Sequence, residues 1–322
     1  MKYNRILFGC GAILALTTLL NATVLQPVSP TESTTRQSAF QNHKEWFAAF
    51  LKNTDQKAVQ KKVILQSLQT NFPYIWQKIQ DPTYTFKASF IGVGSGAVEI
   101  SLVNEWGKAK GAQNHFEIFC EDPSLQMRDE FFAAAEKGGI KEHVVEYSLI
   151  PFEDATYVPP QADLALASHV WYYIKSWRGV ERSNNALVKF AQIFSERSGV
   201  GLITLHSRTS DRYEISSDYA SHFGLEAELA GEEVDAELNN LGIQHKCEIV
   251  ESHLNIESCF DHSIFNPNEE GKQLLSFILR APWDLLSEEV QDRAKRIILS
   301  QVQANGKEEL ILRDCYIWIS PN

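Results

Sequence analysis

Three closely spaced glycines could bring a ligand against the main chain. Gly92, Gly94 and Gly96 lie in the stretch TFKASFIGVGSGAVEISL, between an apolar run and a helix-like run. The pattern predicts a strand, a tight turn and then a helix. Without a Cβ atom the turn lets a ligand approach the backbone, and the start of the helix offers unpaired N–H groups. A tight turn that holds no ligand is the alternative interpretation.

The turn differs from the two common phosphate-binding motifs. A loop for nucleoside triphosphates ends in Gly-Lys-Ser or Gly-Lys-Thr, whereas here the sequence reads GSGAVEI. A dinucleotide fingerprint has the spacing G-x-G-x-x-G, and here the third glycine comes one position early. Glu99, early in the following helix, would also repel a pyrophosphate. We therefore expect a ligand other than these two.

Acidic residues follow the next two predicted strands. Glu121 and Asp122 end the second strand, where a carboxylate suits the two hydroxyls of a ribose. Glu153 and Asp154 lie in a later loop, ahead of a strand that opens at Asp163, where an adenine amino group would be held. Each acid alone could be a solvated loop residue. Together with the glycine turn, they resemble the S-adenosylmethionine site of class I methyltransferases.

Strands and helices must alternate to bring these residues to one edge of a sheet. The predicted strands are 86–92, 115–121, 143–149, 162–169, 199–207, 245–256 and 308–320. The predicted helices are 97–110, 124–138, 179–196, 224–242 and two within 269–304. Such alternation with near-continuous apolar strands is typical of a parallel sheet covered on both faces. With the resemblance, it predicts an α/β fold with a Rossmann-like, seven-stranded, mostly parallel sheet.

From about residue 38 to the C-terminus, the chain resembles the histamine N-methyltransferase family. The likeness lies in SAFQNHKEWFAAFLKNTD, IGVGSG…EI, EDPSLQM, ASHVWYYIKS and LNNLGIQHKCEIVESHLNIESCF. It implies a methyltransferase domain over 38–322, with a helical substrate-capping region from 38–80, about 208–242 and 256–308. The implied activity is transfer of a methyl group from S-adenosylmethionine to a nitrogen of a small amine or imidazole-like molecule. The implied cofactor-binding residues are Gly92, Gly94, Gly96, Glu99, Asp122, Ser124, Glu153, Asp154 and Ser168.

The resemblance also assigns residues to the methyl acceptor. Asp55 lies where the family receives the cationic or imidazole end of its substrate, and His169 lies near the accepting nitrogen. These two are the implied catalytic residues, and both would also touch the substrate. Tyr172 and Tyr173 would form a wall of the site. Asp314 lies near the position of a substrate-contacting amide, and Arg313 is the alternative alignment.

This chain also departs from the family pattern. Where the family places tryptophans over its substrate, the sequence reads SRTSDRYEISSDY, which leaves Tyr213 and Tyr219 as aromatic candidates. We take Tyr213 as the substrate-binding one. Glu99 is shifted by about two positions from the acid that follows the family's glycine turn. The cofactor prediction is therefore stronger than histamine as the substrate.

Composition limits the partners. The 322-residue chain has a net charge of −11, which argues against a nucleic-acid partner and favours a small molecule. Its five cysteines form no CxxC pair, so we expect neither a zinc site nor any other metal site. We expect a monomer.

The N-terminus has the pattern of a leader. Residues 1–25 combine two early positive charges with a long uncharged run, typical of a signal peptide or a membrane anchor, and 26–37 read as a flexible linker. The chain would then be exported or membrane-anchored, and otherwise cytoplasmic. Because S-adenosylmethionine is a cytosolic metabolite, a catalytically inactive binding protein with the methyltransferase fold, exported or membrane-anchored, is the alternative hypothesis.

Overall fold

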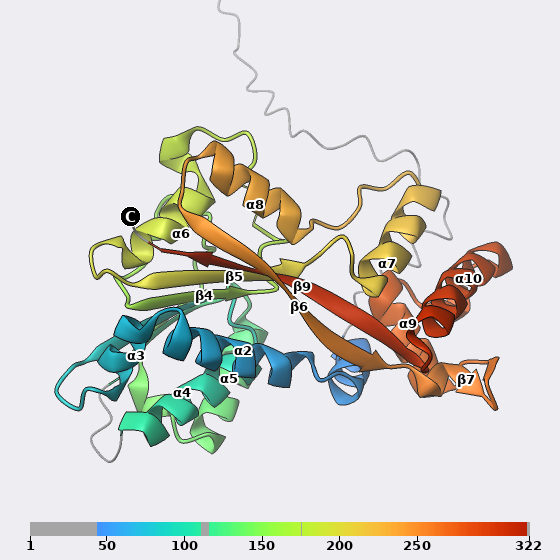
Figure 1. Ribbon diagram of the computed structural model, residues 1–322, viewed down its shortest axis with the longest axis horizontal. Helices are drawn as coiled ribbons and strands as arrows, with labels where there is room; N and C mark the ends of the chain where they lie inside the picture. Colours follow the sequence, from blue (N-terminus) through green and yellow to red (C-terminus); the bar gives the residue numbers. More distant parts are fainter. Residues whose placement is uncertain (1–43, 111–115, 175, 321–322) are drawn as a thin grey trace, which may run out of the picture.

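The computed structural model describes residues 44–110, 116–174 and 176–320 (Figure 1). The predicted leader, the linker and residues 38–43 lie outside the described residues. Within the described part, none of the helices combines the length and the apolar character that crossing a bilayer requires.

The described residues form a seven-stranded sheet with the order β3-β2-β1-β4-β5-β9-β6. Strands β1 to β5 run parallel, and β9 is antiparallel to both β5 and β6. The strands are β1 (Phe86–Ile91), β2 (Phe116–Glu121), β3 (Val144–Ser148), β4 (Leu164–Ser168), β5 (Val200–His206), β6 (His245–Asn255) and β9 (Glu309–Ile319). The strand order reverses between β1 and β4, which is where open α/β sheets bind their ligands.

Helices cover both faces of the sheet (Figure 1). One face packs against α2 (Gln56–Thr70), α3 (Pro73–Gln80), α4 (Ala97–Lys110) and α5 (Leu125–Lys137). The other face packs against α6 (Ala186–Ser195) and α8 (Gly231–Asn240). The central strands are buried almost throughout because they are covered from both sides, which explains their continuous apolar runs. The predicted fold class is confirmed.

A third apolar cluster lies beyond the carboxyl ends of the parallel strands. The last pair between β5 and β9 is His206 with Asp314, so residues 309–313 of β9 project past that edge, together with residues 251–255 of β6 that pair with them. Residues 44–53, which are helical, pack on this projecting ribbon with the helices α7, α9 and α10. These are α7 (Asp211–His222), α9 (Glu269–Leu279) and α10 (Glu288–Asn305), and a small hairpin of β7 (Phe260–Asp261) and β8 (Ile264–Phe265) lies beside them.

The structure corrects three of the predictions about helices. The polar stretch after residue 207 contains a helix, α7, which the sequence did not predict because two of its four buried residues are the charged Asp211 and Arg212. The predicted helix 179–196 is shorter, since α6 begins only after its N-cap Asn185. The predicted helix 224–242 is α8, and it packs on the face of the sheet rather than in the cap.

Asp163 stabilises the opposite edge of the sheet. It precedes β4 and is fully buried, and its carboxylate accepts hydrogen bonds from Tyr84 Oη at 2.7 Å and Lys87 N at 2.9 Å. Lys78 and Arg197 also form ion pairs with it, each at 3.0 Å. Because the amino ends of the parallel strands lie here, Asp163 cannot belong to an adenine site at the carboxyl ends.

Candidate active site

The glycine turn follows β1 at the point where the strand order reverses. All three glycines have positive φ angles, near +58° at Gly92, +54° at Gly94 and +72° at Gly96. A Cβ atom at Gly92 would lie 2.0 Å from Val170, and one at Gly96 would lie 2.6 Å from Phe131. Nothing lies within 4 Å of a Cβ at Gly94. Two glycines are therefore required by packing, whereas Gly94 turns its main chain towards open space.

Two carboxylates hold this turn from the end of β2. Asp122 accepts from Gly94 N at 3.0 Å through Oδ2 and from Ser124 N at 2.9 Å through Oδ1. Glu121 accepts from Gly92 N at 3.2 Å. Burial raises the pKa of Glu121 to about 7, and the neighbouring carboxylate of Asp122 adds to the rise. Ser124 is the N-cap of α5, with Oγ accepting from the N–H of Met127.

The later acidic loop contributes unequally. Glu153 is exposed but close enough to Glu121 for its charge to help raise the pKa of that residue. The Asp154 carboxylate accepts from the N–H and the hydroxyl of Thr156, both at 2.7 Å, so it shapes its own loop. These bonds lower the pKa of Asp154. Glu153 therefore acts on the acids beside the glycine turn, whereas the contacts of Asp154 lie within its own loop.

Glu99 lies buried in the first turn of α4 and faces a lysine from α2. Burial raises the pKa of Glu99, and the charge of Lys57 opposes the rise. Burial lowers the pKa of the half-buried Lys57, and the carboxylates of Glu99 and Asp314 oppose that shift. Lys57 therefore lies between the helix after the glycine turn and the terminal strand β9. Lys57 was not among the residues predicted from the sequence.

A second polar group lies where β4 and β5 end beside the middle of β9. His206 Nδ1 and Asp314 Oδ1 are 2.9 Å apart, and His169 Nε2 and Asp314 Oδ2 are 3.6 Å apart. The Tyr172 hydroxyl lies 3.1 Å from His169 Nδ1 and accepts from His206 N at 3.0 Å. His169 has a positive φ of 54°, a conformation that is costly without glycine and that turns its ring back towards β9. Three of these four residues were predicted from the sequence, whereas His206 was not.

Buried charges on α7 and in the following loop fix His206. Arg212 donates to His206 Nε2, and its guanidinium forms an ion pair with Glu228 at 3.4 Å. Burial and the charge of Arg212 lower the pKa of His206 to about 4, so the ring is neutral at physiological pH. Burial alone would raise the pKa of Asp314, but His169 and His206 hold it well below its usual range.

Two buried glutamines of α2 complete the group. Gln56 Nε2 donates to Asp314 Oδ2 at 2.9 Å, and Gln60 Nε2 donates to Ser168 Oγ at 2.8 Å. Gln60 is fully buried, yet its Oε1 has no hydrogen-bond partner among the described residues. A buried acceptor without a partner is costly unless a water or a ligand supplies the donor.

Three predicted substrate residues lie outside this group. Asp55 precedes α2 with its side chain about half exposed, and its carboxylate accepts from the N–H of His253 at 2.6 Å. Tyr173 is 60% exposed, so it lines no enclosed wall. Tyr213 is half-buried on α7 and interacts electrostatically with the exposed Arg208. The structure brings together His169, Tyr172 and Asp314 but not these three.

His169, His206 and Asp314 also have the side-chain types of a metal centre. One ligand atom from each lies within 4.8 Å of the others, and two histidines with a carboxylate are a known ligand set for iron. However, Arg212 occupies Nε2 of His206, which leaves the proton on Nδ1, facing Asp314. A permanent positive charge and a protonated nitrogen both disfavour a cation. The arrangement fits a hydrogen-bonded group.

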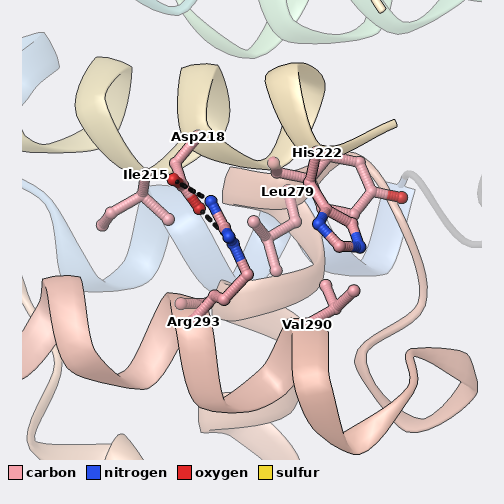
Figure 2. A pocket seen from close by; sticks show the side chains of 8 residues that line it. Ile215, Asp218, His222, Leu279, Val290 and Arg293 are labelled. Carbon is pink, nitrogen blue, oxygen red and sulfur yellow. Dashed lines mark hydrogen bonds and ion pairs between the residues drawn. The ribbon is translucent and has the colours of Figure 1, made fainter. Parts of the chain in front are cut away.

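Two cavities lie away from the glycine turn. The one in Figure 2 lies between α7, α9 and α10 beside the ion pair of Asp218 and Arg293, and its volume of about 10 Å³ holds one water at most. A groove of about 480 Å³ lies between α4 and the start of β2, lined in part by Asn104, Phe116 and His143. This groove is at the amino-terminal edge of the sheet, opposite the glycine turn.

No protein-family model matches the chain, and no curated protein sequence matches it. Solved structures do match. A Galdieria sulphuraria protein, named as a candidate sarcosine dimethylglycine methyltransferase, is 12% identical with a TM-score of 0.44, over 80% of this chain and 84% of that one. The YcgJ protein of Bacillus subtilis is 14% identical with a TM-score of 0.45, over 77% and 97%. A geranyl diphosphate methyltransferase solved with S-adenosylmethionine is 11% identical with a TM-score of 0.39, over 75% and 79%. Methyltransferases are thus among the similar structures, but values this low identify no activity or substrate for the chain.

Proposed function

We propose that this chain is an S-adenosylmethionine-dependent methyltransferase that methylates a nitrogen of a small amine or imidazole-like molecule. The observation that carries the proposal is Gly94. Its main chain faces open space at the point of strand-order reversal, and its N–H is held by the carboxylate of Asp122. The positive φ of Gly94 suits a tight turn, and the place of that turn at the strand-order reversal, where open α/β sheets bind their ligands, is what favours a bound cofactor.

The residues present fit this cofactor. Each oxygen of Asp122 accepts one backbone N–H, and each keeps a second lone pair for a ribose hydroxyl. Asp122 and Glu153 place negative charge beside the turn. That charge would repel the phosphates of a dinucleotide or a triphosphate, whereas S-adenosylmethionine has no phosphate and carries a positive sulfonium.

When bound, the cofactor supplies an electrophilic methyl group on sulfur. The residues of the chain must then hold the acceptor in line with that methyl and exclude water, which can contribute roughly 7–11 kcal/mol when the alignment is ideal. The buried carboxylates of Glu99 and Asp314 would stabilise a positive charge as it moves to the acceptor. The third apolar cluster overhangs this edge of the sheet and would keep water out.

We place the acceptor beside the end of β4. There His169, Asp314 and the unsatisfied Gln60 Oε1 lie on elements that meet at the edge of the glycine turn. The nitrogen acceptor rests on the family resemblance and on the buried carboxylate of Asp314, because Asp55 is bonded to His253 instead. In this proposal the chain is a monomer whose partner is a small amine.

Calorimetric titration with S-adenosylmethionine tests the proposal. We expect binding in the micromolar range, and Asp122→Asn should weaken it about 30-fold because an amide cannot accept both backbone N–H bonds. Asp129→Asn is the matched control, since this acid is 66% exposed on α5 and pairs only with Arg128 in the described structure. Absence of binding by the folded protein would refute the proposal.

A screen of amines and imidazoles with methyl-labelled cofactor then tests the acceptor. Transfer to a nitrogen of one of these compounds is the expected outcome. Binding of the cofactor without transfer to any of them would instead support the inactive binding protein.

A further inference from the structure

The hydrogen bonds around Tyr172 determine where its proton points. The oxygen of Tyr172 accepts from the backbone N–H of His206 at 3.0 Å. Among the described residues, its other hydrogen-bond neighbour is Nδ1 of His169 at 3.1 Å. The phenol has one proton, and a buried hydroxyl that donates to nothing loses free energy. The hydroxyl therefore donates to Nδ1 of His169, which must be unprotonated.

The contacts of His206 and Asp314 leave neither of them as a hydrogen-bond partner for Nε2 of His169. The guanidinium of Arg212 has only donors and donates to Nε2 of His206, so the proton of that ring lies on Nδ1 and is donated to Asp314. The second oxygen of Asp314 accepts from Gln56. Both oxygens of Asp314 accept a hydrogen bond, and Oδ2 also lies 3.6 Å from His169 Nε2, which is beyond hydrogen-bond distance but close enough for its negative charge to favour a proton on Nε2.

We propose that Tyr172 is a positioning residue that fixes the proton of His169 on Nε2, so that His169 presents an N–H to the methyl acceptor. The atom that would carry this proton is buried and has no hydrogen-bond partner among the described residues. A buried N–H without an acceptor needs a hydrogen-bond partner, and an oxygen or nitrogen lone pair of a bound ligand can supply it.

This inference rests on the proposed function for its consequence, and it changes the role of His169. A ring with its proton on Nε2 cannot take a proton there, so His169 is a hydrogen-bond donor rather than the base. It also cannot bond the attacking nitrogen, whose lone pair must face the methyl group. The acceptor therefore carries a second lone-pair atom, a hydroxyl or carbonyl oxygen or another nitrogen, which His169 holds while the first nitrogen reacts.

Nitrogen-15 NMR of histidine-labelled protein tests the tautomer without any methyl transfer. The His169→Gln variant identifies the His169 signals by their loss. At neutral pH we expect one protonated nitrogen, Nε2, and one bare nitrogen, Nδ1. A ring protonated on Nδ1 alone, or on both nitrogens, would overturn the inference. Because the measurement needs no cofactor, it can fail while cofactor binding succeeds, and the reverse also holds.

The Tyr172→Phe variant tests the cause. We expect the ratio of the Nε2–H to the Nδ1–H tautomer to fall about fivefold, as for the loss of one hydrogen bond, with cofactor affinity unchanged. Tyr173→Phe is the matched control, because that side chain is 60% exposed and should leave the ratio unchanged. An unchanged ratio in Tyr172→Phe would show that another group holds the proton. If this variant does not fold, the spectrum of the wild-type protein alone decides between the tautomers.

Discussion

Replacing Gly94 by alanine separates the cost of the backbone from the loss of a ligand. An L-residue at a φ of +54° costs about 1 kcal/mol of stability, and nothing in the described structure obstructs the added methyl group. In the proposed complex that methyl would occupy the space of the cofactor. A ligand displaced by about one ångström would lose its bonds to Asp122, or about 2–3 kcal/mol. We expect about 100-fold weaker binding of S-adenosylmethionine.

Gly306→Ala is the matched control for this change. Gly306 also has a positive φ, 71°, with nothing within 4 Å of its added Cβ, and its N–H is likewise bonded, to Val302 O at 2.9 Å. It ends α10 in the cap, away from the glycine turn. Both variants should lower the melting temperature by about 3 °C, which corresponds to about 1 kcal/mol in a domain of this size.

Calorimetry and thermal melts of the two variants give a clear decision. If Gly94→Ala binds the cofactor as tightly as the unmodified protein, the open space at Gly94 holds no ligand and the proposed function loses its main support. If Gly306→Ala loses binding to the same extent, the effect is one of stability, and the assignment of the turn fails in the same way.

Three further changes test other parts of the structure. The pKa of Glu121 is raised from 4.5 in the unfolded chain to about 7 in the folded protein, so as the pH rises the unfolded chain loses this proton at a lower pH than the folded protein does. The free energy of unfolding should therefore fall by about 3 kcal/mol between these pH values. Urea titrations at pH 5 and pH 8 should show this loss in the unmodified protein but not in Glu121→Gln. Asp163→Asn should reduce the free energy of unfolding by about 2 kcal/mol, because it leaves Lys78 and Arg197 only a neutral partner; a loss below about 0.5 kcal/mol would contradict the ion-pair assignment. Gly92→Ala should destabilise far more than Gly94→Ala in the same thermal melts, since its methyl group would collide with Val170; equal melting temperatures would show that the turn is looser than described.

The sheet and the glycine turn could be predicted because their signals are local. The central parallel strands are short and mostly apolar, and the glycines of the turn directly follow β1. Asp122 could be named for the same reason, since it directly follows β2. The carboxyl ends of parallel strands meet at one edge, so residues at strand ends come together whatever lies between them.

The acceptor side could not be predicted to the same extent because its partners come from distant segments. His206 ends a strand whose apolar residues give no hint that Arg212 will occupy its ring nitrogen. Arg212 and Glu228 lie in a polar stretch that reads as surface, yet both are almost fully buried. Charged residues that are buried in pairs leave no apolar period for a sequence analysis to detect.

The register of α2 shows where a physical pattern was more informative than the resemblance. The resemblance assigned Asp55, but each residue turns a helix by about 100°, so neighbours in sequence face different directions. The buried residues of α2 include Gln56, Gln60, Ile64 and Leu68, which repeat every four positions along one stripe. Because Ile64 and Leu68 face inward, Gln56 and Gln60 on the same stripe are predicted to face inward too. These two side chains donate hydrogen bonds to Asp314 and Ser168, respectively. Two glutamines on an otherwise apolar stripe were thus the signal in the sequence for a polar site beneath the helix.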